Sequence, residues 1–522
     1  MTLIFALLWS VVRCVMIASL AVWPVAAIVS RIEASPTVLS RRLRLLLAIF
    51  PFFLPELLIG FNYRLTVTQL TSGSSPIIAA TCTEALYGLL MFSRCLAVGV
   101  ALSLLMPRRS ATEESLHSWG MLRRSMPSAT WFRGWLRLKI FGSWQASLVA
   151  WSAMALLGFQ EFETAALMQI DQYPISWSVW LFDAHAARLP LWDSLKLMIG
   201  PLLCELAMLC PACCVLFLRP ASDDSGHVSD HSWSCRPTHW TSVRFSALLT
   251  PGVVLFAMWP LINNFLPIVR GGMLMLHSAM FKQSSGQILT STGFAIGATV
   301  LSMGIAVRIL SALSERQDAG RQSLSRALNP SLLARVIQTN WALAAVNLLS
   351  IALLLPGLLG SLVLSLSLLA IFQIAALRIL YDTWLPMLLG QTLAILPFAL
   401  GVVLMLMQTS DPAASHSAKL LELSSETCIR RQSVNIRWRL TTGRWLLGGL
   451  IIAHRCFWDV TVASILRPVE LEPVITRLYN EMHYGRTEAL MSLSILAALT
   501  PVGIAILAML LSRFAAIRMP LQ

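Results

Sequence analysis

The chain has 522 residues, of which 57% are hydrophobic and only 12% are charged, about half the charged share usual for a soluble domain. Its mean hydropathy is +0.71. This composition excludes an ordinary soluble enzyme, a disordered chain and a small secreted scaffold, and it leaves a membrane protein with several spans. The 39 Lys and Arg residues against 25 Asp and Glu residues give a formal net charge of +14. In a membrane protein such an excess is typical of basic loops held on the cytoplasmic side.

The apolar segments predict an all-α polytopic membrane protein. A helix needs about 20 mostly apolar residues to cross the hydrocarbon core of a bilayer. About eleven segments meet this requirement: Leu3–Ser30, Leu43–Asn62, Ala85–Met106, Gly142–Met168, Ser194–Leu218, Ser246–Pro267, Leu289–Leu310, Trp341–Phe372, Trp384–Met407, Gly443–Leu466 and Ala489–Leu511. The segment Trp341–Phe372 is too long for one straight span, and Pro356 and Gly357 in its middle predict a bend.

The basic residues predict the orientation of these spans. If the loop 107–141 is cytoplasmic and the spans alternate, most Lys and Arg residues lie inside. Counting Trp341–Phe372 as two spans would move the basic stretch Lys419–Arg444 outside, so we expect one bent span. The N-terminus is then outside and the C-terminus cytoplasmic. The first segment has no basic stretch before its apolar run, and Arg13 interrupts it, so we expect a retained span rather than a cleaved signal peptide.

The two halves of the sequence resemble each other when shifted by about 300 residues. The matches keep their order along the chain: Leu54-Pro55 with Leu355-Pro356, Ala97 with Ala399, Gly99 with Gly401, Gly142 and Trp144 with Gly443 and Trp445, Phe159 with Phe457, Glu161 with Asp459, Ala165 with Ala463, and His185 with His483. We therefore expect two similar bundles of five and six spans that run the same way through the membrane, as parallel repeats do. The predicted boundaries are 1–219 for the first half, 220–244 for a cytoplasmic linker and 245–522 for the second half.

Each half contains one long basic loop before a Gly and Trp pair, at 107–141 and 409–442. Both loops are long for a helical bundle, and each holds a helix-compatible stretch, Glu113–Ser125 and Ser415–Ser425. A matched pair of cytoplasmic helices suits the docking of a symmetric soluble partner. The alternative is that the basic loops only set the topology.

Several short patterns resemble those of the fused, two-half permeases of bacterial binding-protein-dependent ABC importers, the iron(III) type in particular. Each half of that family carries a cytoplasmic coupling helix marked Glu-Ala-Ala with a Gly four residues after the last Ala. Glu114 and Gly120 keep this spacing, although both Ala residues are absent. The second loop carries Ala418 and Leu421 with neither the Glu nor the Gly in register. The stretches Pro356–Gly360, Phe457–Thr461 and Arg477–Gly485 also resemble members of the iron(III) type.

The resemblance implies a permease subunit that moves a small solute, iron(III) or another metal ion, across the bacterial inner membrane by alternating access. A cytoplasmic ABC ATPase dimer would dock on the loops at Glu114, Gly120, Ala418 and Leu421, and a periplasmic solute-binding protein would deliver the solute. We expect no cofactor, no enzymatic activity of the chain itself and no nucleic-acid partner; membrane lipid surrounds the bundle. The sequence has no P-loop, so another subunit would have to bind the ATP.

Ionisable residues inside predicted spans are candidates for a substrate pathway, because such residues are costly in a bilayer and usually face a cavity or a partner. The matched acids Glu161 and Asp459 would line an outward vestibule and attract a cation, or they form hydrogen bonds between helices. The matched residues His185 and His483, expected in outside loops, would bind a transition metal or cap a helix. The cysteines Cys210, Cys213 and Cys214, with His residues in the loop after them, match no closed metal-site spacing, so a metal site stays open.

Two other classes of membrane protein remain as alternatives. A secondary transporter driven by an ion gradient would not need paired cytoplasmic helices. A membrane-embedded lipid-linked glycosyl transferase or polymerase usually has a large polar outside loop with paired acids, whereas the predicted outside loops are about 20 residues long. Both alternatives therefore fit the sequence less well than the importer permease.

Overall fold

The computed structural model describes residues 3–54, 56–105, 119–125, 127–141, 144–169, 175–186, 189–217, 240–275, 278–325, 352–358, 360–409, 443–483 and 487–518, with positions 417, 420, 421, 433 and 436. These residues form helices and include no strand. Within these described ranges, five helices are long and apolar enough to cross a membrane, or up to nine if each bent helix pair is one span. The predicted all-helical class with several membrane-embedded helices is confirmed, while the number of eleven spans stays a prediction. The chain divides into two compact units, Met1–Phe265 and Leu266–Gln522.

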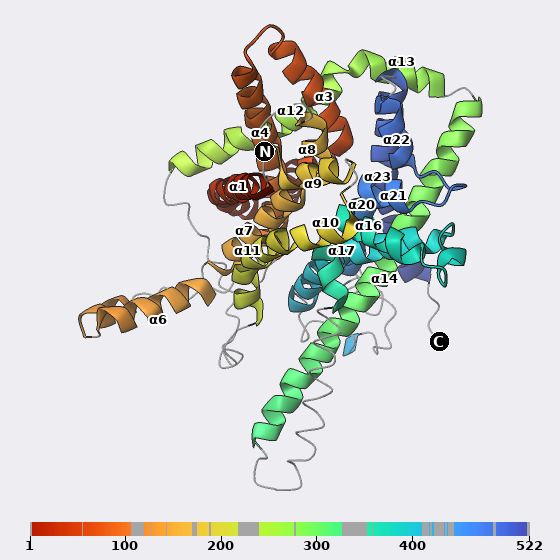
Figure 1. Ribbon diagram of the computed structural model, residues 1–522. Helices are drawn as coiled ribbons and strands as arrows, with labels where there is room; N and C mark the ends of the chain where they lie inside the picture. The colour runs from red at the N-terminus through yellow and green to blue at the C-terminus, as the bar shows by residue number, and fades with distance from the viewer. Residues whose placement is uncertain are drawn as a thin grey trace. The chain divides into compact units, whose positions relative to one another are not determined.

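The first unit is built around three mutually packed helices, α1, α4 and α7 (Figure 1). Around them, α11 packs on α7, α9 packs on α1, and α3 packs on both α4 and α8. In chain order its elements are α1 (Leu3–Glu33), α2 (Val38–Ile49), η1 (Phe50–Phe53), α3 (Glu56–Leu70), α4 (Pro76–Leu105), η2 (Leu122–Arg124), α6 (Ser128–Phe141), α7 (Gln145–Gln160), α8 (Glu163–Met168), α9 (Trp177–Ala186), α10 (Leu191–Leu197), α11 (Ile199–Phe217) and α12 (Trp240–Asn263).

The second unit is also built around three mutually packed helices, α14, α17 and α20. Around them, α23 packs on α20, α22 packs on α14, and α16 packs on both α17 and α21. In chain order its elements are α13 (Phe265–Met275), α14 (Ser278–Ser325), a short helix Ala352–Leu358, α16 (Ser361–Phe372), η4 (Arg378–Leu380), α17 (Trp384–Thr409), α20 (Gly443–Phe457), α21 (Val460–Leu466), α22 (Val474–His483) and α23 (Thr487–Arg518).

The helix α12 belongs to the first unit by its contacts. It packs against α1, α2, α3 and α4. The hydroxyl of Tyr63 on α3 donates to the backbone carbonyl of Phe256 on α12 at 2.6 Å. The sequence instead assigned the span Ser246–Pro267 to the second half, starting at residue 245, because hydropathy alone does not show which helices a span contacts. The first compact unit ends at Phe265. The division of the chain into two permease halves at residues 220–244 stays a prediction.

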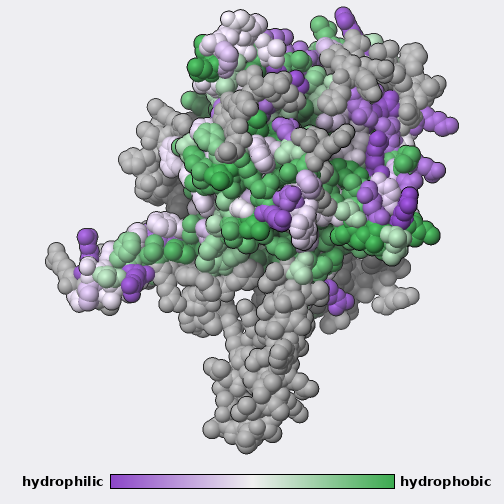
Figure 2. Space-filling view, viewed as in Figure 1, coloured by the Kyte–Doolittle hydropathy of each residue, from purple (hydrophilic) through white to green (hydrophobic). Residues whose placement is uncertain are grey.

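The helix α1 shows how the first unit suits a membrane. Its buried face carries small and polar side chains, including Ser10, Arg13 and Cys14. Its exposed face carries large apolar side chains instead: Ile4, Phe5, Leu8, Val12, Met16, Leu20 and Trp23. Hydrophobic side chains cover much of the described surface in the view of Figure 2. A soluble helix would show the opposite pattern, so the exposed face of α1 fits contact with lipid.

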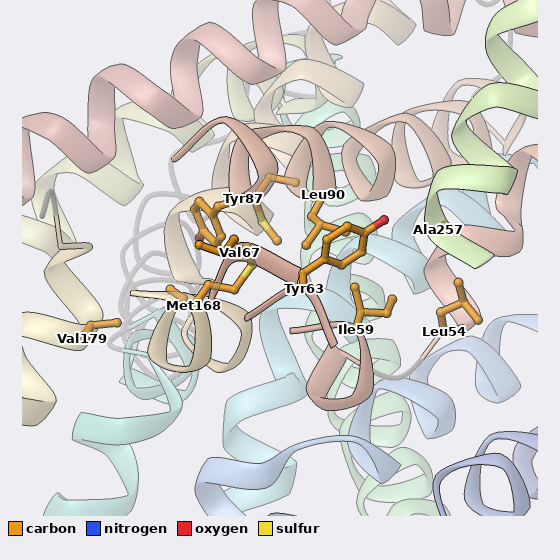
Figure 3. Packing of buried hydrophobic residues seen from close by; sticks show 11 residues of the cluster. Leu54, Ile59, Tyr63, Val67, Tyr87, Leu90, Met168, Val179 and Ala257 are labelled. Carbon is orange, nitrogen blue, oxygen red and sulfur yellow. The ribbon is translucent and has the colours of Figure 1, made fainter. Parts of the chain in front are cut away.

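A hydrophobic cluster joins the helices of the first unit (Figure 3). Tyr63 and Val67 of α3 meet Tyr87 and Leu90 of α4 and Met168 of α8 in this cluster. Tyr87 and Leu90 are almost fully buried. The cluster therefore fixes the short helix α8 against α3 and α4, which positions the break between α7 and α8.

Several apolar helices bend sharply where the sequence predicted straight spans. Leu39–Phe53 and Glu56–Leu70 meet at 75°, and Gly443–Phe457 and Val460–Leu466 meet at 56°. The largest bend, 119°, joins Ala352–Leu358 to Ser361–Phe372. The sequence predicted a bend in this segment at Pro356 and Gly357, whereas both residues lie inside the first helix and the break follows Leu358. Gly360 sits at this bend with φ 82°, a conformation that favours glycine.

Close packing at Gly99 gives a test of the first unit. A Cβ atom at Gly99 on α4 would lie 2.7 Å from both Val25 Cγ2 of α1 and Met154 Sδ of α7. A Cβ at Gly88 on the same helix meets no atom within 4 Å. We expect Gly99→Leu to lower the free energy of unfolding by about 1–3 kcal/mol through overpacking, and Gly88→Leu to change it little. Thermal unfolding in detergent measures both; equal losses would contradict the packing of α1, α4 and α7.

Candidate functional site

The break between α7 and α8 is held by the carboxylate of Glu161. The helix α7 ends at Gln160, and Glu161 follows in an extended conformation with φ −65° and ψ 125°. The backbone amide of Thr164 donates to Oε1 of Glu161 at 2.5 Å, and the amide of Ala165 donates to Oε2 at 3.2 Å. The first amides of a helix have no partner inside the helix, and apolar surroundings offer them no water. Glu161 therefore acts as the cap of α8.

Side chains from two further helices also contact Glu161. The hydroxyl of Tyr87 on α4 donates to Oε2 of Glu161 at 2.8 Å. The hydroxyl of Ser178 on α9 donates to the backbone carbonyl of Glu161 at 3.1 Å. Glu161 is only 3% exposed. The break is thus a buried polar junction that links α4, α8 and α9, and both carboxylate oxygens are used.

Asp459 holds the corresponding break in the second unit. The helix α20 ends at Phe457, and Asp459 adopts an extended conformation with φ −75° and ψ 98°. Its Oδ1 accepts a hydrogen bond from the backbone amide of Val462 at 3.1 Å, which caps α21. Glu161 and Asp459, matched in the sequence, therefore have the same local geometry. Capping accounts for both acids inside apolar segments, and their role in a cation vestibule stays a prediction.

A second pair of caps was not predicted from the sequence. The backbone amide of Trp177, at the start of α9, donates to the hydroxyl of Ser10 on α1 at 3.0 Å. The amide of Val474, at the start of α22, donates to the hydroxyl of Ser291 on α14 at 2.8 Å. In each unit the first long helix thus supplies a hydroxyl to the helix after the broken pair. A single Ser in an apolar helix gives no sequence signal of this role, because the amide that it caps is distant in the chain.

The buried basic residues of the first unit have acidic partners. Arg94 on α4 pairs with Glu56 at the start of α3. Arg13 on α1 contacts Glu84 Oε1 on α4 at 3.2 Å and also donates to the hydroxyl of Ser176. Both Arg residues are nearly fully buried. Sequence reasoning listed Arg13, Arg94 and Glu56 as charges inside spans but did not single out Glu84. Pairing is what a buried charge requires, because an unpaired charge in an apolar interior is costly.

The carboxyl group of Glu205 lies beside the end of α7. Glu205 belongs to α11 and is fully buried. The side-chain Nε2 of Gln160 donates a hydrogen bond to Oε1 of Glu205 at 3.2 Å. Gln160 is the last residue of α7, directly before the cap residue Glu161. A polar contact from α11 therefore holds the end of α7.

The predicted coupling residues are described only in part. Gly120 is exposed, and a Cβ atom there meets no atom within 4 Å. Leu421 is 44% exposed. Glu114 and Ala418 lie outside the described residues, as do residues 113–118 of the first predicted helix, Glu113–Ser125, and most of the second, Ser415–Ser425. The spacing of Glu114 and Gly120 therefore stays a sequence prediction.

The predicted histidine and cysteine sites gain no support as metal centres. His185 lies on α9 and His483 is the last residue of α22, so both belong to helices rather than to the loops that the sequence predicted. Among the described residues, no group of three or more His, Cys, Asp or Glu side chains could hold a metal ion. Cys210 and Cys214 lie one turn apart on α11, with their Sγ atoms at 3.8 Å. The His residues after them lie outside the described residues.

Comparisons of the chain with models of protein families, with curated proteins and with solved structures found no match. The geometry of the two units therefore carries the functional argument. Its main feature is a pair of polar junctions, one in each unit, at which an acidic side chain holds a break in an apolar helix.

The two caps give a prediction that distinguishes them. Both carboxylate oxygens of Glu161 accept hydrogen bonds. In Glu161→Gln an amide NH₂ group replaces one of these oxygens. This donor then faces another donor, the amide of Thr164 or the hydroxyl of Tyr87, and no hydrogen bond forms there. We expect this variant to lose about 1–3 kcal/mol of unfolding free energy. Asp459→Asn keeps an oxygen for the amide of Val462 and should cost clearly less, whereas Asp459→Ala should cost about 1 kcal/mol. Denaturation in detergent measures all three; a Glu161→Gln protein as stable as the wild type would contradict the cap.

Proposed function

We propose that the protein is the membrane-embedded permease subunit of an ABC importer, built from two repeated bundles. The observation that supports this proposal is that the two units use the same helix pairs. Eight helix contacts of the first unit have a counterpart in the second. In the first unit they are α1–α4, α1–α7, α4–α7, α7–α11, α3–α4, α3–α8, α4–α8 and α1–α9. Their counterparts, in the same order, are α14–α17, α14–α20, α17–α20, α20–α23, α16–α17, α16–α21, α17–α21 and α14–α22. A correspondence of this extent is expected of a repeat and not of two unrelated bundles.

The burial of matched residues supports the same repeat. Ala97 and Ala399 are both fully buried, as are Ala165 and Ala463. These pairs were matched from the sequence alone. Together with the caps at Glu161 and Asp459, they support the pairing of α4 with α17 and of α8 with α21 in the proposed repeat.

Paired broken helices favour transport over other membrane roles. In many transporters, discontinuous helices of two repeats line the substrate path, because a break places polar groups inside the membrane. Here each unit packs one broken helix against another, α3 against α8 and α16 against α21. We propose that these junctions lie beside the path, and that the two repeats run the same way through the inner membrane, with the N-terminus outside.

Transport by this chain would draw its energy from another subunit. The sequence has no P-loop, and the proposed docking sites for a cytoplasmic ATPase dimer are the two basic loops around Gly120 and Leu421. Both residues are exposed. A periplasmic binding protein would deliver the solute, and the resemblance to iron(III)-type permeases makes iron(III) the first substrate to test.

Gly120 offers a test of coupling that leaves the fold intact. The space around Gly120 is open, so Gly120→Phe should not disturb the packing of the chain. A coupling segment must approach its ATPase closely, and a bulky side chain prevents this approach. We expect Gly120→Phe to reduce substrate-stimulated ATP hydrolysis by about tenfold or more, corresponding to about 1.4 kcal/mol of docking free energy.

The measurement uses the chain reconstituted with its copurified ATP-binding subunits and with iron(III)-loaded binding protein. Gly120→Ala serves as the matched control, since it adds only a Cβ atom. The coupling role of Gly120 is wrong if Gly120→Phe retains full stimulation and uptake. The importer proposal as a whole fails if no ATP-binding subunit copurifies and uptake follows an ion gradient instead.

A further inference from the structure

The segment from Trp119 to Trp144, which begins beside the proposed docking residue Gly120, carries basic and aromatic side chains whose combination docking at Gly120 does not explain. It includes η2, α6 and the turn before α7. Its five basic residues are Arg123, Arg124, Arg133, Arg137 and Lys139, and it contains no acidic residue. We call this segment the basic aromatic segment.

A reciprocal pair of tryptophan contacts folds the basic aromatic segment on itself. Trp131 Nε1 donates to the backbone carbonyl of Trp119 at 2.9 Å, and Trp119 Nε1 donates to the carbonyl of Trp131 at 3.4 Å. A Cβ atom at Gly134 would overlap the ring of Trp119, so any larger residue there would displace this ring. The residues before α6 are thus fixed against it, and the segment presents a defined surface.

This surface presents aromatic, apolar and basic groups together. The guanidinium of Arg123 lies 5.4 Å from the centre of the Trp131 ring, and Lys139 Nζ lies 6.0 Å from that of Trp135. Phe132 is 53% exposed and Met121 is 69% exposed. Apolar side chains with this exposure beside cations are typical of helices that lie in the interface of a membrane.

The angle between α6 and α7 places the segment along a membrane surface. Residues Ser128–Ile140 and Gln145–Gln160 meet at 71°. If α7 runs along the membrane normal, α6 lies at roughly 20° to the membrane plane, which is the geometry of an interfacial helix. In Figure 1, α6 extends away from α1, α7 and α11. Among the described residues, the main helix contacts of α6 are with η2 and α7.

We propose that the basic aromatic segment lies in the cytoplasmic headgroup layer and binds anionic phospholipids. The cytoplasmic leaflet carries a negative surface potential, and each nearby Lys or Arg gains attraction from it. Trp and Phe side chains insert at the depth of the headgroups, while Arg and Lys contact the phosphates. The segment then acts as an anchor that fixes the start of α7. The inference rests on the membrane embedding of α7 and on the proposed orientation, and it does not depend on an ATPase.

Hydrogen exchange of the full-length protein in nanodiscs tests this anchor. The probes are nanodiscs of phosphatidylcholine alone and nanodiscs that also contain phosphatidylglycerol, without any partner subunit. We expect peptides that cover α6 to exchange about tenfold more slowly in the anionic nanodiscs. The difference should shrink at 0.5 M salt, because salt screens exposed charges.

Two charge-removal variants complete the test. Arg133→Gln with Lys139→Gln should abolish the slowing in anionic nanodiscs and should exchange like the wild type in neutral nanodiscs, which shows that the fold is intact. Arg41→Gln with Arg42→Gln removes the same charge from the exposed face of α2 and should keep the slowing on α6. Equal exchange of α6 in both lipids would overturn the proposal and favour a protein partner for this surface. Slowing that survives in the Arg133 and Lys139 variant would overturn it as well.

Discussion

A helix that breaks among apolar side chains leaves backbone amides that must find a partner within the protein, and this constraint explains how both units are built. Glu161 and Asp459 satisfy the amides of α8 and α21, while Ser10 and Ser291 satisfy those of α9 and α22. The caps allow short helices to follow long ones inside the bundle. Without them, α8 and α21 would each begin with unsatisfied amides and could not pack stably against α3 and α16.

The same requirement governs the buried charges of the first unit. Large apolar side chains occupy the exposed face of α1, so its polar residues turn inward. Arg13 then contacts Glu84 and Ser176, and Arg94 contacts Glu56. These contacts join α1 to α4 and α3 to α4, while close packing at Gly99 brings α4 against α1 and α7. The outer surfaces of the helices are mostly apolar and do not distinguish one helix from another. Polar junctions and close packing therefore specify how the helices are arranged.

The sequence predicts the apolar helices and their all-helical class, because hydropathy acts locally. It predicts a bend within Trp341–Phe372 but places it at Pro356, whereas the break follows Leu358 and Gly360 supplies the positive φ. It does not predict the breaks at Glu161 and Asp459, since neither residue has a proline beside it and the break depends on tertiary contacts. It matches these two acids through the repeat and offers two roles for them, charges of a vestibule or hydrogen bonds between helices. It gives no sign of Ser10, Ser291 or Glu84, whose roles depend on partners distant in the chain. It also assigns α12 to the second half, whereas its contacts with α1, α3 and α4 place it in the first unit.

The proposed function requires that two repeated bundles run the same way through the membrane and that Trp341–Phe372 counts as one bent span. The most direct measurement is the accessibility of a short epitope inserted in the full-length chain after Ser125 or, in a second version, after Leu421. Intact spheroplasts expose only the outer surface to an antibody, and inverted vesicles expose only the cytoplasmic surface. The account predicts binding in inverted vesicles alone for both insertions. Binding to one epitope in spheroplasts and to the other in inverted vesicles would contradict it, because the two bundles would then be inverted relative to each other.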